Sequence, residues 1–491
     1  MGSINSALSL TTGALNADQA ALSIVANNVA NANTPGYTEE EPDWQQNAPI
    51  SVGALSFGDG VTETGATSQR DRVLEARLDQ QQQLASASSA RLTALNNIQA
   101  LFTPDSGSSS ATAGDIGSDI TSLFDSFSSL EANPTNNALR ESVLSSASTL
   151  AGDISSAANS LNQQQAALDQ EASGVVTQVN SLTQTIAQLN LQIQSTSPDA
   201  DAGTLEDQRQ QDLSQLSQLI GINQITTENN GLSITTTSGQ LLVSEGQSFQ
   251  ITTGTDEGVT HFSLGGTDIT TQLASGDGQL GGLLTARDQD IPSALNSLDQ
   301  LAYNISTAVN AQNNAGIDVN GDTGAAVANS TTGAMTLDIF APPPTYAANQ
   351  ASGNSNVSGA AAAMTVVMTD PNLIAAAGAN KGTGDNSNAV TIANLAGGVI
   401  VDGQTPINFY SNFVSTLGST VAAVQTENTA QEASVTQLQT QNNALSSVNL
   451  NDEAAAMSTL ENSYQAASQV FTLLNTIMAS ALNLGVETSV S

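Results

Sequence analysis

The chain has 491 residues, with 45 Asp and Glu against 8 Lys and Arg, so its formal net charge is −37. This length suggests about three domains, and an apolar content of 39% is enough for buried cores. So few positive charges cannot form the basic surface that binds nucleic acid or an anionic membrane. No apolar run is long enough to insert into a bilayer. The absence of Cys excludes disulfides, thiolate zinc sites and cysteine nucleophiles.

The first segment predicts an amphipathic helix that ends in a turn. Its apolar stripe repeats every seven residues and consists of Leu8, Leu15, Leu22 and Val29. Pro35 disfavours helical backbone at Thr34, and Gly36 readily enters a turn, so the helix should end near residues 31–37. Residues 1–69 contain no Lys or Arg and their leucines are spaced apart, unlike a secretory signal. We therefore expect a chain that is cytoplasmic or exported without a cleaved signal peptide.

The middle of the chain predicts long helices with β-rich insertions. A seven-residue repeat from Ile154 to Leu189 extends to Ile193, and this helix would be about 60 Å long if Gly174 does not interrupt it. Similar apolar seams run over 74–102, 295–309 and 421–445. Short β-rich runs with turn signals fill 221–269, whereas the Gly-, Ala-, Asn- and Ser-rich stretch after 316 predicts a small β domain or an irregular insert.

The last segment predicts a second amphipathic helix. Its apolar positions alternate spacings of three and four, through Met457, Leu460, Tyr464, Ala467, Phe471, Leu474 and Met478. Terminal helices normally fray unless they are docked. The two terminal helices could pair with each other within one chain or with other copies of the chain. Their near lack of charges that would specify one partner favours the second interpretation.

The motifs that could support chemistry are better explained as structural features. Gly276, Gly278 and Gly281 match a dinucleotide fingerprint, but no clear strand precedes them and we expect a turn. Asp318 begins a run with calcium-loop spacing, but Thr323 stands where glycine is needed, which favours an Asx turn. We therefore nominate no catalytic, cofactor-binding or metal-binding residue, and His261 is expected on a surface strand.

Half of the positive charges lie close together in one helical stretch. They are Arg70, Arg72, Arg77 and Arg91. They could pair with the acidic surface of their own chain or contact an acidic neighbouring subunit.

The segment from Ala26 to Thr38 resembles the N-terminal motif of the bacterial flagellar rod, hook and hook-associated proteins. The motif residues in this chain are Asn28, Asn31, Asn33, Thr34, Pro35, Gly36 and Tyr37. Further stretches resemble the hook-associated members at the hook–filament junction, namely 69–78, 281–288, 298–302, 316–321, 384–389 and 448–453. One departure is that Glu39, Glu40 and Glu41 follow the motif where relatives commonly have Arg-Gln.

The resemblance implies a non-enzymatic structural subunit without cofactors, located outside the cell in the flagellum. It implies export through the flagellum's own channel and terminal helices that stay disordered until they assemble. The implied partners are copies of the chain in a ring, the hook protein, a second hook-associated junction protein, and an export chaperone on the C-terminal helix. The hook protein itself and a secreted glycan-binding protein are the alternatives.

The expected fold is mainly α with inserted β: terminal coiled-coil helices, a long-helix bundle and outward β-rich parts. Residues 1–40 would form the axial helix and turn and would pair with 449–491. The bundle would comprise 41–220, completed by 281–315 and 396–448. A β-rich segment would cover 221–280, and an outer β-rich or irregular insert 316–395.

Overall fold

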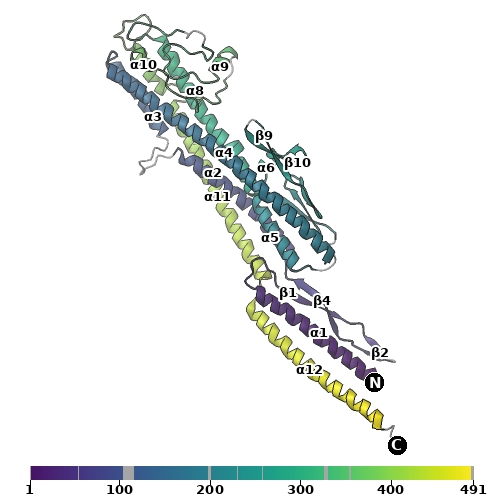
Figure 1. The fold of residues 1–491 in the computed structure, drawn as a ribbon. Coiled ribbons are helices and arrows are strands. Elements are labelled where there is room, and N and C mark those ends of the chain that lie inside the picture. Colours follow the sequence, from purple (N-terminus) through teal and green to yellow (C-terminus); the bar gives the residue numbers. More distant parts are fainter. Residues whose placement is uncertain are drawn as a thin grey trace.

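The computed structural model describes residues 2–52, 55–102, 115–196, 201–228, 230–256, 258–325, 330–352 and 355–487. The molecule is elongated, and both termini lie at one end, as Figure 1 shows. The terminal helices α1 (Gly2–Asn31) and α12 (Leu450–Glu487) lie side by side there. Mainly α architecture with terminal helices and inserted strands is thus confirmed. Along the described ranges, no helix combines the length and apolarity needed to cross a bilayer.

The body is built around one helix of 60 residues. This is α4 (Asn137–Thr196), which would be about 90 Å long at a rise of 1.5 Å per residue. Gly174 does not interrupt it, and a Cβ at this position would meet no atom within 4 Å, so the helix does not require glycine there. The other long helices packed in the body are α2 (Arg72–Ala100), α3 (Ile116–Ala132), α5 (Thr204–Leu219), α8 (Ile291–Ala315) and α11 (Pro406–Ser446).

Two antiparallel sheets cover the second half of α4. The first has the order β5–β6–β7–β8, formed by Ile222–Thr226, Leu232–Thr236, Leu241–Ser244 and Gln247–Ser248. The second has the order β11–β10–β9, formed by Thr267–Asp268, Val259–Leu264 and Ile251–Asp256. Asn180 and Asn190 of α4 hold the sheets, because their side chains bond the backbone of Ile251 and Leu232. The strands predicted after the turn signals at Asn230 and Ser238 are present as β6 and β7.

Two hydrophobic cores lie on either side of the middle of α4. The first gathers α3, the first half of α4, α8 and the start of α11 around side chains such as Phe127, Leu161 and Phe340. The second gathers the rest of α4, α5, the sheets and the short helices α6 (Thr270–Ala274) and α7 (Gly278–Thr285). Neither cluster contains a described residue of α1 or α12. The terminal pair is therefore held by something other than these cores.

The described part of 41–68, expected above in the helical bundle, forms strands and their connections instead. They are β1 (Glu40–Gln46), β2 (Ile50–Val52), β3 (Leu55–Phe57) and β4 (Val61–Ser68). β1 pairs antiparallel with β4, and this hairpin packs along α1. The sequence conceals it because the strands are largely polar and lack the apolar alternation by which a half-buried strand is recognised.

For the stretch after α8, the sequence left open a small β domain or an irregular insert, and the structure shows the irregular insert. Within the described part of 316–395 there are isolated bridges, the short helices α9 (Tyr346–Ser352) and α10 (Ser387–Ala393), and the single turn η2 (Pro371–Leu373). The turn η3 (Asn394–Gly397) follows α10. Side-chain amides of α8 bond the backbone of this stretch in place of a strand partner. Asn310 bonds the backbone of Ile339 and Phe340, and Asn313 bonds the backbone of Leu337 and Ala375.

Of the three glycines of the dinucleotide-like motif, Gly276 lies in the bend before α7, whereas Gly278 begins that helix and Gly281 lies within it, ahead of the π-helical turn η1 (Ala286–Asp290). Gly278 has a φ of +82°, and a Cβ on Gly281 would overlap the carbonyl oxygen of Gly276. Packing of the backbone, and not a phosphate, therefore explains the motif. The Asx turn at Asp318 is also present, because its carboxylate accepts from the amides of Asn320 and Asp322, both at 2.8 Å.

We predict that Gly281→Ala destabilises the fold by about 1–3 kcal/mol, because the added methyl group meets backbone that cannot move freely. Gly174→Ala is the matched control, and it should stabilise α4 by roughly 0.5–1 kcal/mol. Chemical denaturation followed by circular dichroism measures both values. A neutral Gly281→Ala variant would contradict the close packing.

Candidate assembly site

The two terminal helices face each other through stripes of different character. On α12 the predicted apolar positions Met457, Leu460, Ala467, Phe471, Leu474 and Met478 are half-buried, and Tyr464 is 38% exposed. On α1 the most buried apolar side chains are the small Ala17, Ala21 and Val25. The leucine stripe lies beside them, with Leu8, Leu15 and Leu22 half-buried and Val29 exposed. The small side chains allow close approach of neighbouring elements, a feature that the seven-residue leucine repeat did not reveal.

Asn28 of the family motif joins four separate segments. Its side-chain nitrogen donates to the Oε1 of Glu453 in α12 at 2.8 Å and to the carbonyl oxygen of Glu40 at 2.9 Å. Its side-chain oxygen accepts from the hydroxyl of Tyr37 at 2.8 Å and from the backbone amide of Glu40 at 3.1 Å. Asn28 is 1% exposed and its hydrogen-bonding capacity is fully used. It therefore links α1, the turn, β1 and α12.

The rest of the motif shapes the turn after α1. Asn31 bonds Asn27 one turn earlier, and Thr34 donates to Asn31 at 3.2 Å. Gly36 has a φ of +81°, a backbone conformation that favours glycine. Asn33 and Pro35 are exposed. The turn thereby delivers Tyr37 to Asn28, and burial together with four nearby carboxylates raises the pKa of the Tyr37 hydroxyl.

The turn is fastened to the body by ion pairs of α2 and α5. Asp207 accepts from the amide of Thr38 at 3.2 Å and forms an ion pair with Arg70. Arg72 pairs with Glu206 at 2.9 Å. Arg91 meets Asp290 at 2.9 Å, so three of the four clustered arginines pair within the chain. Intramolecular pairing is therefore confirmed for these three.

The acidic departure from the family motif has structural roles in this chain. The amide of Glu39 donates to the carbonyl of Ser446, the end of α11, and its carboxylate accepts from the amide of Asn449 at 3.3 Å. Asn449 directly precedes α12, where negative charge is favourable at a helix N-terminus. Burial, Asp207 and Asp201 raise the pKa of Glu40. Glu41 is exposed. The Glu39 carboxylate therefore binds backbone at the place where both terminal helices leave the body, whereas Glu40 is held through its own backbone by Asn28.

The region where the terminal helices meet the body, around Asn28, Thr38 and Glu453, is called the joint. Further buried carboxyl groups lie near it in α2. Burial raises the pKa of Glu75 to about 7, although Arg70 nearby lowers it. Burial also raises the pKa of Asp79 to about 6, opposed by bonds from Gln224 and Gln210. The joint between the terminal pair and the body is thus rich in buried acid. Sequence reasoning found Asn28 and Tyr37 through the motif, and Glu453 lies in a stretch that resembles the family, but its bond to Asn28 was missed. Asp207 was missed altogether, because it follows no recognisable local pattern.

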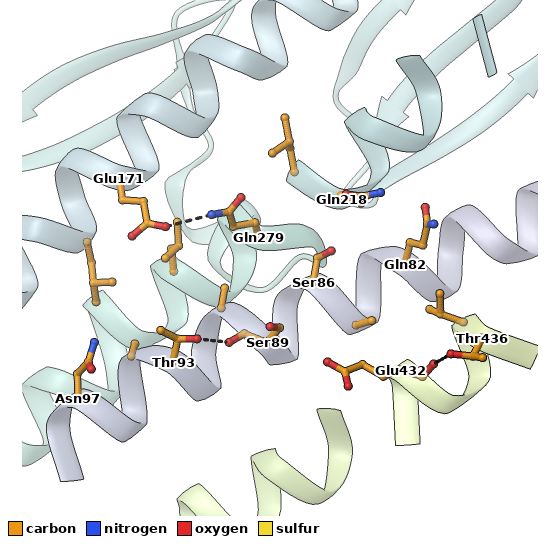
Figure 2. Close-up of a pocket in the computed structure, with 17 residues that line it drawn as sticks. Gln82, Ser86, Ser89, Thr93, Asn97, Glu171, Gln218, Gln279, Glu432 and Thr436 are labelled. Atoms are coloured by element: carbon orange, nitrogen blue, oxygen red, sulfur yellow. Dashed lines mark hydrogen bonds between the residues drawn. The ribbon is translucent and has the colours of Figure 1, made fainter. Parts of the chain in front are cut away.

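A cleft in the body was considered as a separate site. It has a volume of about 730 Å³ and lies between α2, α4, α5, α7 and α11, as Figure 2 shows. Its lining is mostly Gln, Ser, Thr, Asn and Ala with two carboxylates, and Glu171 already accepts from Gln279 at 3.0 Å. No group of three or more His, Asp or Glu side chains in the described ranges is arranged to hold a metal ion. The joint remains the better candidate.

Comparison with known proteins agrees with these features. Residues 105–327 match the family model described as the flagellar hook-associated protein FlgK helical domain, and residues 8–38 match that of flagella basal body rod protein. The chain is 26% identical to "Flagellar hook-associated protein 1" of Escherichia coli (strain K12), covering 98% of this chain and 99% of that one. It is 25% identical to the protein of that name from Bacillus subtilis (strain 168), covering 96% of each.

A solved structure is also similar. It is the flagellar hook junction protein FlgK from Burkholderia pseudomallei, with a TM-score of 0.62 and 20% identity. The match covers 74% of this chain and 99% of that one. At this identity the likeness supports the fold.

We predict that Asn28→Asp loosens the end of α1, because it removes the donor to Glu453 and places a second buried carboxylate beside it. The cost should be about 1–3 kcal/mol. Hydrogen exchange measured by mass spectrometry should be about tenfold or more faster near residues 24–31 and 450–456, with α4 unchanged. The matched control is Asn33→Asp at the exposed motif asparagine, and equal exchange in both variants would refute the role of Asn28.

The pKa of Glu75 predicts a pH dependence. Because the folded state raises this pKa from 4.5 to about 7, it binds the proton more tightly than the unfolded chain, and stability must fall as pH rises through this window. Glu75→Gln should therefore gain on the order of 2 kcal/mol relative to the parent chain between pH 5 and pH 8. Denaturant midpoints across pH measure this difference. Glu41→Gln removes an exposed charge as the control, and parallel pH curves for Glu75→Gln and the parent would contradict the prediction.

Proposed function

The chain belongs to the family of flagellar hook-associated proteins, and on that premise we propose that it forms a ring of identical copies at the junction between hook and filament. In this ring the terminal helix pairs would pack with those of neighbouring copies to form the axial part. The body, with its sheets and the irregular 316–395 region, would face outward. The domain division given under the sequence analysis is part of this proposal, except that the β1–β4 hairpin belongs with the terminal helix α1 and not with the bundle.

The observation that carries the proposal is the apolar surface that α12 retains beside α1. Val470, Leu473 and Ile477 lie along one line of α12 and are 49%, 61% and 44% exposed. This line lies next to the half-buried stripe that includes Phe471, so the apolar arc is wider than a single partner helix can cover. A further helix would bury it. In a family of structural flagellar proteins, neighbouring copies supply such helices.

The same surface supports two further parts of the proposal. Before assembly, α12 would be covered by a cytoplasmic export chaperone that shields its apolar arc. Export would then use the flagellum's own channel without a cleaved signal peptide. After assembly, the ring would contact the hook protein on one side and a second hook-associated junction protein on the other.

We predict that Phe471→Asp abolishes incorporation at the hook–filament junction while leaving the body folded, because Phe471 lies outside both cores. Leu15→Asp should have the same effect. The matched control is Gln469→Asp, which adds the same charge on an exposed position of the same helix. Immunogold labelling and swimming assays measure incorporation and function. Normal motility of Phe471→Asp would contradict the assembly role.

A further inference from the structure

The positive charges of this chain are almost entirely used within it. Six of the eight basic side chains bond acidic groups, amides or backbone carbonyls: Arg70, Arg72, Arg91, Arg140, Arg209 and Arg287. Lys381 interacts electrostatically with Asp385, near α10 at the far end of the molecule in Figure 1. Arg77 remains, exposed in the second turn of α2, and its side chain makes no ion pair or hydrogen bond within the described part of the chain.

The terminal part of the chain has the opposite composition. Residues 1–69 and 449–491 contain eleven Asp and Glu and no Lys, Arg or His. The β1–β4 hairpin concentrates this charge beside the only tryptophan of the chain. Trp44 is 41% exposed and stands directly opposite Glu63 in the ladder, and the exposed Asp43 precedes it. No base within these terminal segments can pair with the hairpin, so any cation that binds it belongs to another part of the chain or to another molecule.

The chemistry of the two surfaces is complementary. A guanidinium group stacks on an indole ring and pairs with carboxylates at the same time. Val73, one turn before Arg77, is 65% exposed and adds an apolar contact for the ring. Both surfaces flank the joint, since β4 ends at Ser68 and α2 begins at Arg72. No hydrogen bond or ion pair joins Arg77 to the hairpin of its own chain.

We propose that Arg77 of one copy docks on the β1–β4 hairpin of a neighbouring copy, with its guanidinium over Trp44 and against Glu63, which stands opposite Trp44 in the ladder. The inference rests on the proposed function, because neighbouring copies meet in the assembled ring. Among the bases that a second copy can offer, Arg77 is the one that is exposed, unpaired and close to the joint. The contact would fix the lateral register of the copies, whereas the terminal helices supply the apolar packing.

Site-specific cross-linking tests the contact. The chain contains no Cys, so cysteines can be introduced without background. Gln45→Cys, beside Trp44, and Gln80→Cys, beside Arg77, both leave the contact itself intact and lie at exposed positions. The two single variants are produced together, and purified hook–filament junctions are treated with a short bismaleimide. A cross-linked pair of the two chains is expected, and the control pair Gln45→Cys with Lys381→Cys should give none.

Charge reversal provides the second arm. Arg77→Glu should reduce the cross-linked product at least tenfold, and Glu63→Arg in the same chain should restore it. Lys381→Glu makes the same charge change at the far end and should leave the product unchanged. Absence of the cross-link, in junctions that contain both cysteine variants, would overturn this contact alone. Absence of the parent chain from the junctions would overturn the proposed function, and the contact with it.

Discussion

One buried asparagine connects the terminal helices of this molecule to each other and to the rest of the chain. Asn28 satisfies donors and acceptors from α1, the turn at Tyr37, β1 and α12. The two hydrophobic cores end within the body and include no described residue of the terminal pair. A buried polar network is stabilising only when all its members are bonded, and it then specifies one arrangement. The family motif therefore preserves a defined geometry where apolar packing is weak.

This constraint explains how a rigid body and an adaptable terminal pair can coexist. The body is held by two cores around α4, and its arginines other than Arg77 are fixed by internal ion pairs and hydrogen bonds. The terminal pair has half-buried apolar stripes, an exposed line on α12 and no positive charge. Such a pair leaves apolar surface exposed, which similar helices of neighbouring copies would cover under the proposed function. The net charge of −37 then opposes association in solution until apolar contacts and the few available cations are brought together.

The parts of the fold that repeat a local pattern were predictable. The seven-residue seam predicted the part of α4 from Ile154 to Ile193, though not its start at Asn137, and turn residues predicted the β6–β7 hairpin, since both depend on nearby positions in sequence. The β1–β4 hairpin was missed because its strands are largely polar. They pair with each other and pack along α1, a contact that no local sequence pattern shows. The most buried face of α1 was missed because it consists of Ala17, Ala21 and Val25, whereas the sequence pattern is dominated by the neighbouring leucines.

The network of the joint could be predicted only in part. The motif identified Asn28 and Tyr37, but the bond to Glu453 spans 425 residues of sequence. Nothing in the local pattern near Glu453 distinguishes it from an ordinary helix-start carboxylate. Asp207 also could not be identified from its local pattern. It lies on α5, for which the sequence indicated no functional role, and it reaches the turn only because α5 packs against α2.

The central claim is that the terminal helices are completed by neighbouring copies. Hydrogen exchange of the parent chain, measured by mass spectrometry as free monomer and within purified hook–filament junctions, tests it most directly. In the monomer, amides of α1 and α12 should exchange orders of magnitude faster than those of α4, and in the junction they should become as protected as α4. Protection of α1 and α12 equal to that of α4 in the free monomer would contradict the account.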